Sequence, residues 1–178
     1  MPENPKLALT EHRAQAELNV RYAWGILAAL AAGWLLLIFS APFAAYSGFK
    51  GFASTVYYLF GFICHQRPDR SYFIFGHELA VCSRCIGIYF GVFLGLIFYP
   101  IWRPMNEPKG LPRIGLFLAM LPIGFDWLLG VTGIWQNTFF SRTLTGLILG
   151  AACATYIMPA IVEIVLNKSF GLNKRVAD

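Results

Sequence analysis

The sequence predicts an all-α integral membrane protein: a helical bundle of four transmembrane helices with one short interfacial or re-entrant helix. Of the 178 residues, 57% are hydrophobic and only 13% are charged, whereas a soluble domain carries about 25% charged residues. Uncharged runs recur along the chain, and one crossing of a bilayer needs about 20 apolar residues. The chain therefore has room for one bundle and for no second globular domain.

The uncharged runs give the predicted elements in order. A first span is expected at 22–45, and its apolar run is longer than the core of about 7 to 15 residues in a secretory signal peptide, so we interpret it as an anchor. Three further spans are expected at 81–102, 113–131 and 141–166. The uncharged segment at 51–63 would reach only ~20 Å as a helix, less than the ~30 Å hydrocarbon core.

Basic residues predict the orientation of this bundle. Nine of the 14 Lys and Arg residues fall within or next to the tail at 1–21, the loop at 103–112 and the tail at 167–178. By the positive-inside rule, these three segments are expected in the cytoplasm of a cell-membrane protein. The segments at 46–80 and 132–140 then lie outside the cytoplasm. A fifth span within 46–63 would invert this charge bias.

Glycines spaced by four residues occur in two of the predicted spans. Gly87, Gly91 and Gly95 lie in the second span, and Gly146 and Gly150 lie in the fourth. Such spacing allows two helices to approach closely in a membrane. We expect these glycines to pack the bundle itself, with dimerisation as the alternative.

The stretch "CHQRPDRSYFIFGHELAVCSRC", residues 64–85, gathers three of the four cysteines and two of the three histidines. Its spacing fits a tetrahedral zinc site with Cys64, His65, His77, Cys82 and Cys85 as candidate ligands. Two alternatives remain open. The cysteines could form a structural disulfide, or Cys82 and Cys85 could be a redox-active CxxC pair, because a helix N-terminus lowers the pKa of a thiol.

Arginines at the same end of the bundle suggest an anion site. Arg84 and Arg142 lie in the first turns of two spans, where the helix dipole disfavours a cation. Asp126 could compensate by pairing with Arg142, or a bound anion such as a lipid phosphate could lie among the arginines. The candidate anion-binding residues are Arg67, Arg70, Arg84 and Arg142, and the residues that could orient a headgroup are Gln66, Ser71, Trp135, Gln136 and Asn137.

The motifs "CHQRPDRS", "GHELAVCSRCIGIY", "FDW" and "RTLTGLILG" resemble a family of small bacterial and archaeal predicted membrane proteins that carry a domain of unknown function. The resemblance covers about residues 55 to 150, and its two longer motifs follow the patterns CHQRPxRS and VCxRCxGIY. It implies no reaction, cofactor or substrate. It implies that the matching positions belong together, namely Cys64, His65, Arg67, Arg70, Ser71, Cys82, Arg84, Cys85 and Gly87.

Three functions are consistent with these residues. In the first, a zinc centre beside the arginines binds or acts on an anionic membrane lipid, with Asp126 and His77 as the catalytic residues that move protons. In the second, Cys82 and Cys85 cycle between dithiol and disulfide, Cys64 resolves the intermediate, and quinone takes the electrons. In the third, the chain is a non-catalytic subunit that binds a membrane protein partner or a second copy of itself. Nucleic acid is not an expected partner, because the basic residues are divided between two membrane faces.

Overall fold

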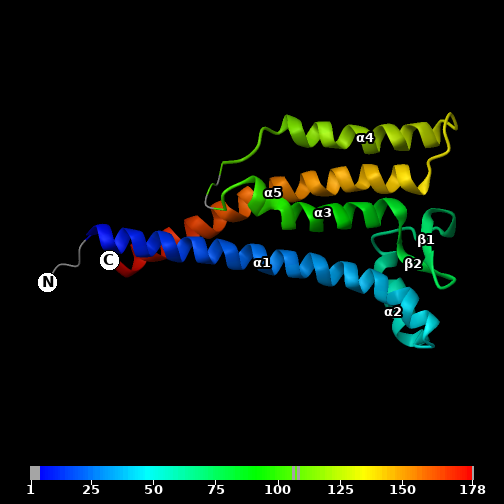
Figure 1. The fold of residues 1–178 in the computed structure, drawn as a ribbon, viewed down its shortest axis with the longest axis horizontal. Coiled ribbons are helices and arrows are strands. Elements are labelled where there is room, and N and C mark those ends of the chain that lie inside the picture. The colour runs from blue at the N-terminus through cyan, green and yellow to red at the C-terminus, as the bar shows by residue number, and fades with distance from the viewer. Residues whose placement is uncertain (1–4, 106, 108, 178) are drawn as a thin grey trace.

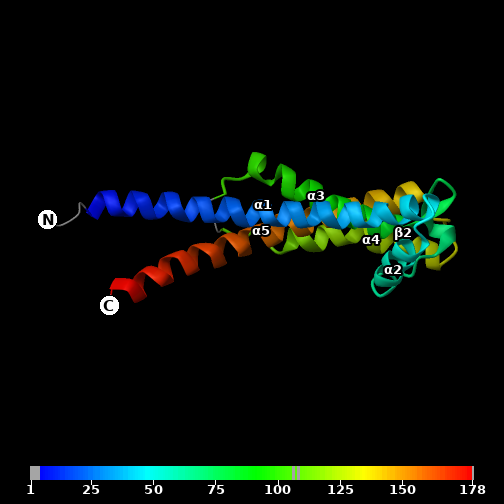
Figure 2. The same cartoon turned by 90° about the horizontal axis from the view of Figure 1, so that it is seen from below.

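The computed structural model describes residues 5–105, 107 and 109–177, and they fold into an elongated helical bundle (Figure 1). The long helices are α1 (Pro5–Tyr46), α3 (Ser83–Trp102), α4 (Ile114–Val131) and α5 (Phe139–Ala177). Among the described residues, four helices are long and apolar enough to cross a membrane. The predicted fold class is thereby confirmed. Figures 1 and 2 show both termini at one end and the short elements at the other.

Two of the long helices extend beyond the predicted spans. α1 starts at Pro5 and α5 continues to Ala177, whereas the sequence predicted spans at 22–45 and 141–166. The polar tails contain many good helix formers such as Ala, Leu, Glu and Lys, which continue a helix after it leaves an apolar region. Charge therefore indicates the limits of an apolar span but not the ends of the helix.

Glycines bring α3 and α5 together. A Cβ at Gly87 would overlap the backbone of Thr143, and one at Gly91 would overlap the backbone of Leu147. Gly150 of α5 meets the backbone of α3 in the same way. The spaced glycines thus pack this bundle internally, because only a residue without a side chain fits between the two backbones.

α4 is joined to the bundle differently. It packs against α5, and Asp126 is its only buried residue. The buried side chain of this apolar helix is therefore its only charged one, and many of its apolar side chains, such as Phe117 and Leu121, are exposed, as expected for a helix that faces lipid.

A short helix and a hairpin cover the end of the bundle that is opposite the termini. α2 (Lys50–Gly61) is a 12-residue helix that buries Ala53, Val56 and Phe60, and the ring of Phe60 lies 5.1 Å from the ring of Trp34 in α1. A 3-10 turn, η1 (Pro68–Arg70), then leads into the antiparallel strands β1 (Ser71–Ile74) and β2 (His77–Cys82).

The hairpin was not among the predicted elements. A two-residue turn joins the strands, with positive φ at Phe75 (52°) and Gly76 (78°), as in the turns that match the twist of paired strands. β2 continues directly into α3, so Cys82 ends the strand and also forms the N-cap of the helix.

Candidate metal centre and anion pocket

Three cysteine sulfurs meet where the hairpin joins α3. Cys64 lies in the loop after α2, Cys82 is the N-cap of α3, and Cys85 lies in the first turn of α3. Their Sγ atoms all lie within 4.8 Å of one another, and none is in a disulfide. Zinc–sulfur bonds of about 2.3 Å in a tetrahedron place sulfurs about 3.8 Å apart. The three sulfurs are therefore close enough to share one metal ion.

Hydrogen bonds fix the loop that carries Cys64. Gln66, which has a positive φ of 45°, donates its amide to the carbonyl oxygens of Tyr57 (2.7 Å) and Ala80 (2.8 Å). The backbone N–H of Cys82 donates to Sγ of Cys64 at 3.1 Å. The loop is thus tied both to α2 and to β2. Gln66, predicted as a residue that could orient a headgroup, thus holds the loop in place.

The position of Cys82 favours the thiolate, the form that binds metals. Cys64 is buried, with 4% of its surface exposed, and it accepts the backbone N–H described above. Hydrogen bonding by the Cys64 and Cys85 thiols lowers the pKa of the Cys82 thiol, and backbone N–H groups at the start of α3 lower it further. Cys82 therefore loses its proton more readily than an isolated thiol does.

The two candidate histidines do not join the sulfurs. Among the described residues, the group that could hold a metal consists of the three cysteines. His65 is exposed and lies at the pocket described next. His77 begins β2 and pairs across the hairpin with Ile74. The structure therefore brings together three of the five candidate ligands.

All four candidate arginines line one pocket beside the sulfurs. The pocket has a volume of about 640 Å³, and its walls come from the loop and turn at 65–70, from Cys82 at the end of β2 and from the adjacent ends of α3, α4 and α5. Cys82 and Cys85 line it as well, so two of the three clustered cysteines and the arginines share one space. Its lining residues are His65, Arg67, Arg70, Cys82, Arg84, Cys85, Ile88, Trp127, Gly130, Val131, Asn137 and Arg142.

Asp126 pairs with Arg84 instead of Arg142. The guanidinium of Arg84 lies 2.5 Å from Oδ2 of Asp126, and Asn137 donates to the same oxygen at 2.8 Å and to the Asp126 carbonyl at 2.6 Å. The predicted pair with Arg142 is wrong in its partner, because α3 presents Arg84 directly to α4. The carboxylate holds Arg84 and Asn137 in place.

Opposite charges in the pocket do not balance. Arg67 and Arg70 each lie 3.2 Å from Asp69. Slight desolvation raises the pKa of this carboxyl, but hydrogen bonds and charge from Arg67 hold it below its usual value, with Arg70 contributing. Arg142 has no ion pair with any residue that the structure describes. Four guanidinium groups thus face two carboxylates, an excess of two positive charges.

A family model described as predicted membrane proteins, DUF2085, matches residues 64–156. This range contains the three clustered cysteines, the four arginines and Asp126. The chain belongs to the DUF2085 family. The resemblance that the motifs suggested is confirmed, and the matched range includes the complete pocket and the cysteine cluster but not α1.

Two archaeal proteins are similar to this DUF2085 chain. An uncharacterised protein of Methanocaldococcus jannaschii is 38% identical over 138 residues, which cover 75% of this chain and 88% of that protein. An uncharacterised protein of Methanothermobacter thermautotrophicus is 33% identical over 95 residues, or 53% of this chain and 84% of that protein. No solved structure matches the chain.

Proposed function

We propose that this multi-pass membrane protein binds zinc through Cys64, Cys82 and Cys85 and binds a phosphate-bearing anion in the adjoining arginine pocket. The observation that carries the proposal is the shared lining: Cys82 and Cys85 face the same pocket as the four arginines. A metal held there and an anion held there would be neighbours.

The donor set fits zinc. Thiolates are ligands that zinc prefers, and a site with three protein ligands leaves a fourth position for water or substrate. Because two of the three cysteines line the pocket, that fourth position would be accessible from it. Zinc bound there would polarise a phosphoryl or acyl oxygen or lower the pKa of a bound water. Asp126 would act indirectly in this proposal, by positioning Arg84.

The charges fit one phosphodiester. A zinc ion with three thiolates has a net charge of −1, and the excess of the arginines over Asp69 and Asp126 is two positive charges. One positive charge remains, which matches the single negative charge of a phosphodiester. Guanidinium groups suit this ligand because their planar forks donate two hydrogen bonds to neighbouring phosphate oxygens.

The proposed orientation places the pocket outside the cytoplasm. The pocket lies at the end of the bundle opposite both termini, and most basic residues lie in the termini and in the loop between α3 and α4. Under the positive-inside rule this charge bias supports cytoplasmic termini. A thiol reagent that does not cross membranes, applied to intact cells after chelation, should then label Cys64 or Cys82, and labelling only in lysed cells would contradict this orientation.

Elemental analysis tests the metal centre. Purified protein should contain about one zinc per chain, and Cys64→Ser, Cys82→Ser and Cys85→Ser should each lose it, because two remaining thiolates bind zinc weakly. Cys153→Ser is the matched control, since Cys153 lies within α5 away from the cluster. Protein without metal in which two thiols are oxidised would contradict the proposal and favour the dithiol oxidoreductase with quinone as acceptor.

Calorimetric titration tests the anion pocket. The probe is dihexanoyl phosphatidylglycerol, a short-chain lipid with one negative charge, and dihexanoyl phosphatidylcholine serves as the neutral comparison. Arg142→Gln should weaken phosphatidylglycerol binding about tenfold, the loss of one charge-assisted contact. Arg113→Gln, at the opposite end of the bundle, should leave it unchanged. Equal affinity for both lipids would refute the anion pocket.

A further inference from the structure

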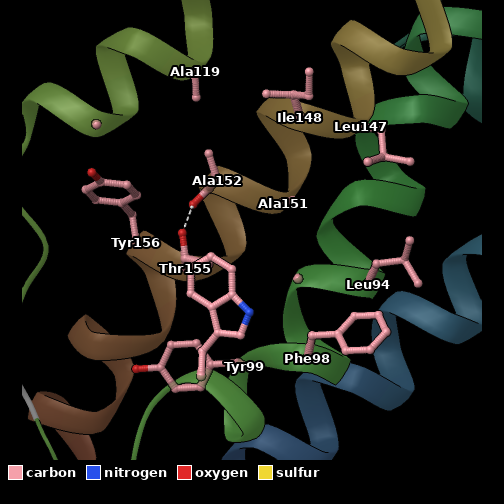
Figure 3. Close-up of a pocket in the computed structure, with 13 residues that line it drawn as sticks. Leu94, Phe98, Tyr99, Ala119, Leu147, Ile148, Ala151, Ala152, Thr155 and Tyr156 are labelled. Atoms are coloured by element: carbon pink, nitrogen blue, oxygen red, sulfur yellow. Dashed lines mark hydrogen bonds between the residues drawn. The ribbon is translucent and has the colours of Figure 1, made fainter.

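A second pocket lies between α3, α4 and α5, nearer the end that carries the termini (Figure 3). Its volume is about 510 Å³, and its walls are almost entirely apolar. Figure 3 shows Ala119 of α4 facing Ala152 of α5, with Leu94 and Phe98 contributed by α3. At the end nearer the termini, the hydroxyl of Tyr156 donates to the carbonyl of Pro112 at 2.7 Å.

The apolar pocket and the arginine pocket lie along the same three helices. On α3 they are separated by six helical steps, from Ile88 to Leu94, or about 9 Å, and on α4 by eight steps, from Ala119 to Trp127, or about 12 Å. A polar pocket at one end is thus followed, within the same group of helices, by an apolar one.

We propose that the apolar pocket holds the hydrocarbon chain of a phospholipid whose phosphate lies among the arginines. This inference rests on the proposed function and specifies its ligand: a membrane lipid, not a water-soluble phosphate. Positive charge at one end and an apolar cavity further along match the two parts of such a lipid. The occupant is therefore an amphiphile with a single negative charge and a long chain.

The distance along α3 from one pocket to the far end of the other sets the length of the hydrocarbon chain that would be bound. Trp102, at the far end of the apolar pocket, lies 14 positions after Ile88 at the arginine pocket, about 21 Å along the helix. Half of the hydrocarbon core measures about 15 Å. The bound chain would extend past the middle of the bilayer, beside α3 and α4, so chains of six carbons reach only the polar end. Chain length thus separates this inference from the anion pocket alone.

Photolabelling tests where the chain lies. The probe is phosphatidylglycerol with an 18-carbon chain that carries a diazirine near its end, incorporated into vesicles with the full-length protein. Labelled residues found by mass spectrometry should fall in 94–102 of α3 and 115–119 of α4. Ala152→Phe, which fills the pocket, should reduce that labelling about fivefold, an effect of the size expected from lost packing. Ala29→Phe on the exposed face of α1 is the matched control.

Four results test the inference. Labelling of the apolar pocket that decreases in Ala152→Phe and in Arg142→Gln, with zinc retained as evidence of folding, supports the inference. Ala119→Phe repeats the test from α4. Labels spread evenly over the lipid-facing surface of α1 would overturn it, even if dihexanoyl phosphatidylglycerol still binds and the anion pocket stands. Labelling of the apolar pocket that is unchanged in Arg142→Gln would overturn the link between the two pockets. Failure of the short-chain lipid to bind would instead overturn the proposed function.

Discussion

The ion pair between Arg84 and Asp126 joins α3 to α4, and Asp126→Asn removes its negative charge with little change in shape. The substitution leaves the guanidinium of Arg84, whose side chain is 23% exposed, without a counter-ion. Removing one partner of a buried pair costs about 3–5 kcal/mol. The partial exposure of Arg84 places the expected loss at the lower limit, about 3 kcal/mol.

For a chain of this size, 1 kcal/mol shifts the unfolding midpoint by about 2–4 °C, so Asp126→Asn should lower it by about 6–12 °C. Thermal unfolding in mild detergent can be followed by tryptophan fluorescence, because Trp127 is next to the substituted residue. Glu163→Gln is the control, since Glu163 is an exposed acid in α5. It should shift the midpoint by less than 2 °C, the range of surface substitutions.

A double variant separates the charge from the shape. Arg84→Met combined with Asp126→Leu replaces both charges by apolar groups, and such replacements are often neutral or stabilising. Its midpoint should lie well above that of Asp126→Asn. A midpoint for Asp126→Asn that equals the Glu163→Gln control, or a double variant less stable than either single change, would refute the view that this pair holds α4 to the bundle.

Three further predictions concern the rest of the molecule. Gly91→Leu should destabilise the fold by about 1–3 kcal/mol through overpacking against α5, whereas Gly25→Leu, which meets no atom within 4 Å, should not; unfolding midpoints compare the two. Gln66→Ala removes the donor to two backbone carbonyls and should weaken zinc binding about tenfold, as measured by competition with a chelator. Gln136→Ala, at an exposed loop position, should leave zinc binding unchanged. Asp69→Asn releases two arginines and should raise phosphatidylglycerol affinity about threefold. The pKa of Asp69 is lowered in the folded protein, so its ion pairs persist above the unfolded pKa and are lost as the pH falls through the folded pKa. Acidification should therefore raise the affinity for phosphatidylglycerol, as Asp69→Asn does.

The long helices could be predicted because lipid imposes a simple rule on them. An uncharged run of about 20 residues is a sufficient signal for a span, and the run after Arg84 predicted a span without any further signal. The hairpin lacked such a signal, because its strands have only four and six residues. Its one local indication was Gly76, at the second position of a two-residue turn between aromatic and aliphatic residues.

The sequence could predict which residues form the candidate site but not which of them are in contact. The cysteines and arginines were identifiable because soft ligands and cations are rare in an apolar chain. Which of them meet depends on the rotation of each helix about its axis, and this rotation follows from long-range packing at positions such as Gly87. Arg84 and Arg142 both begin spans at the same end of the bundle, so the sequence could not decide which of them reaches Asp126.

The way α4 is attached has a consequence for how the protein is made. An acidic residue adds up to about 2.5–3.5 kcal/mol, its cost at the centre of a span, to the free energy of insertion by the translocon. Asp126 lies in the C-terminal half of α4, and α4 is still apolar enough to be a candidate span. Arg84 is synthesised before α4, and Asn137 follows it. α4 would therefore enter the bilayer as a separate helix and associate with the others afterwards, so that the ligand-binding region is completed only in this last step of assembly.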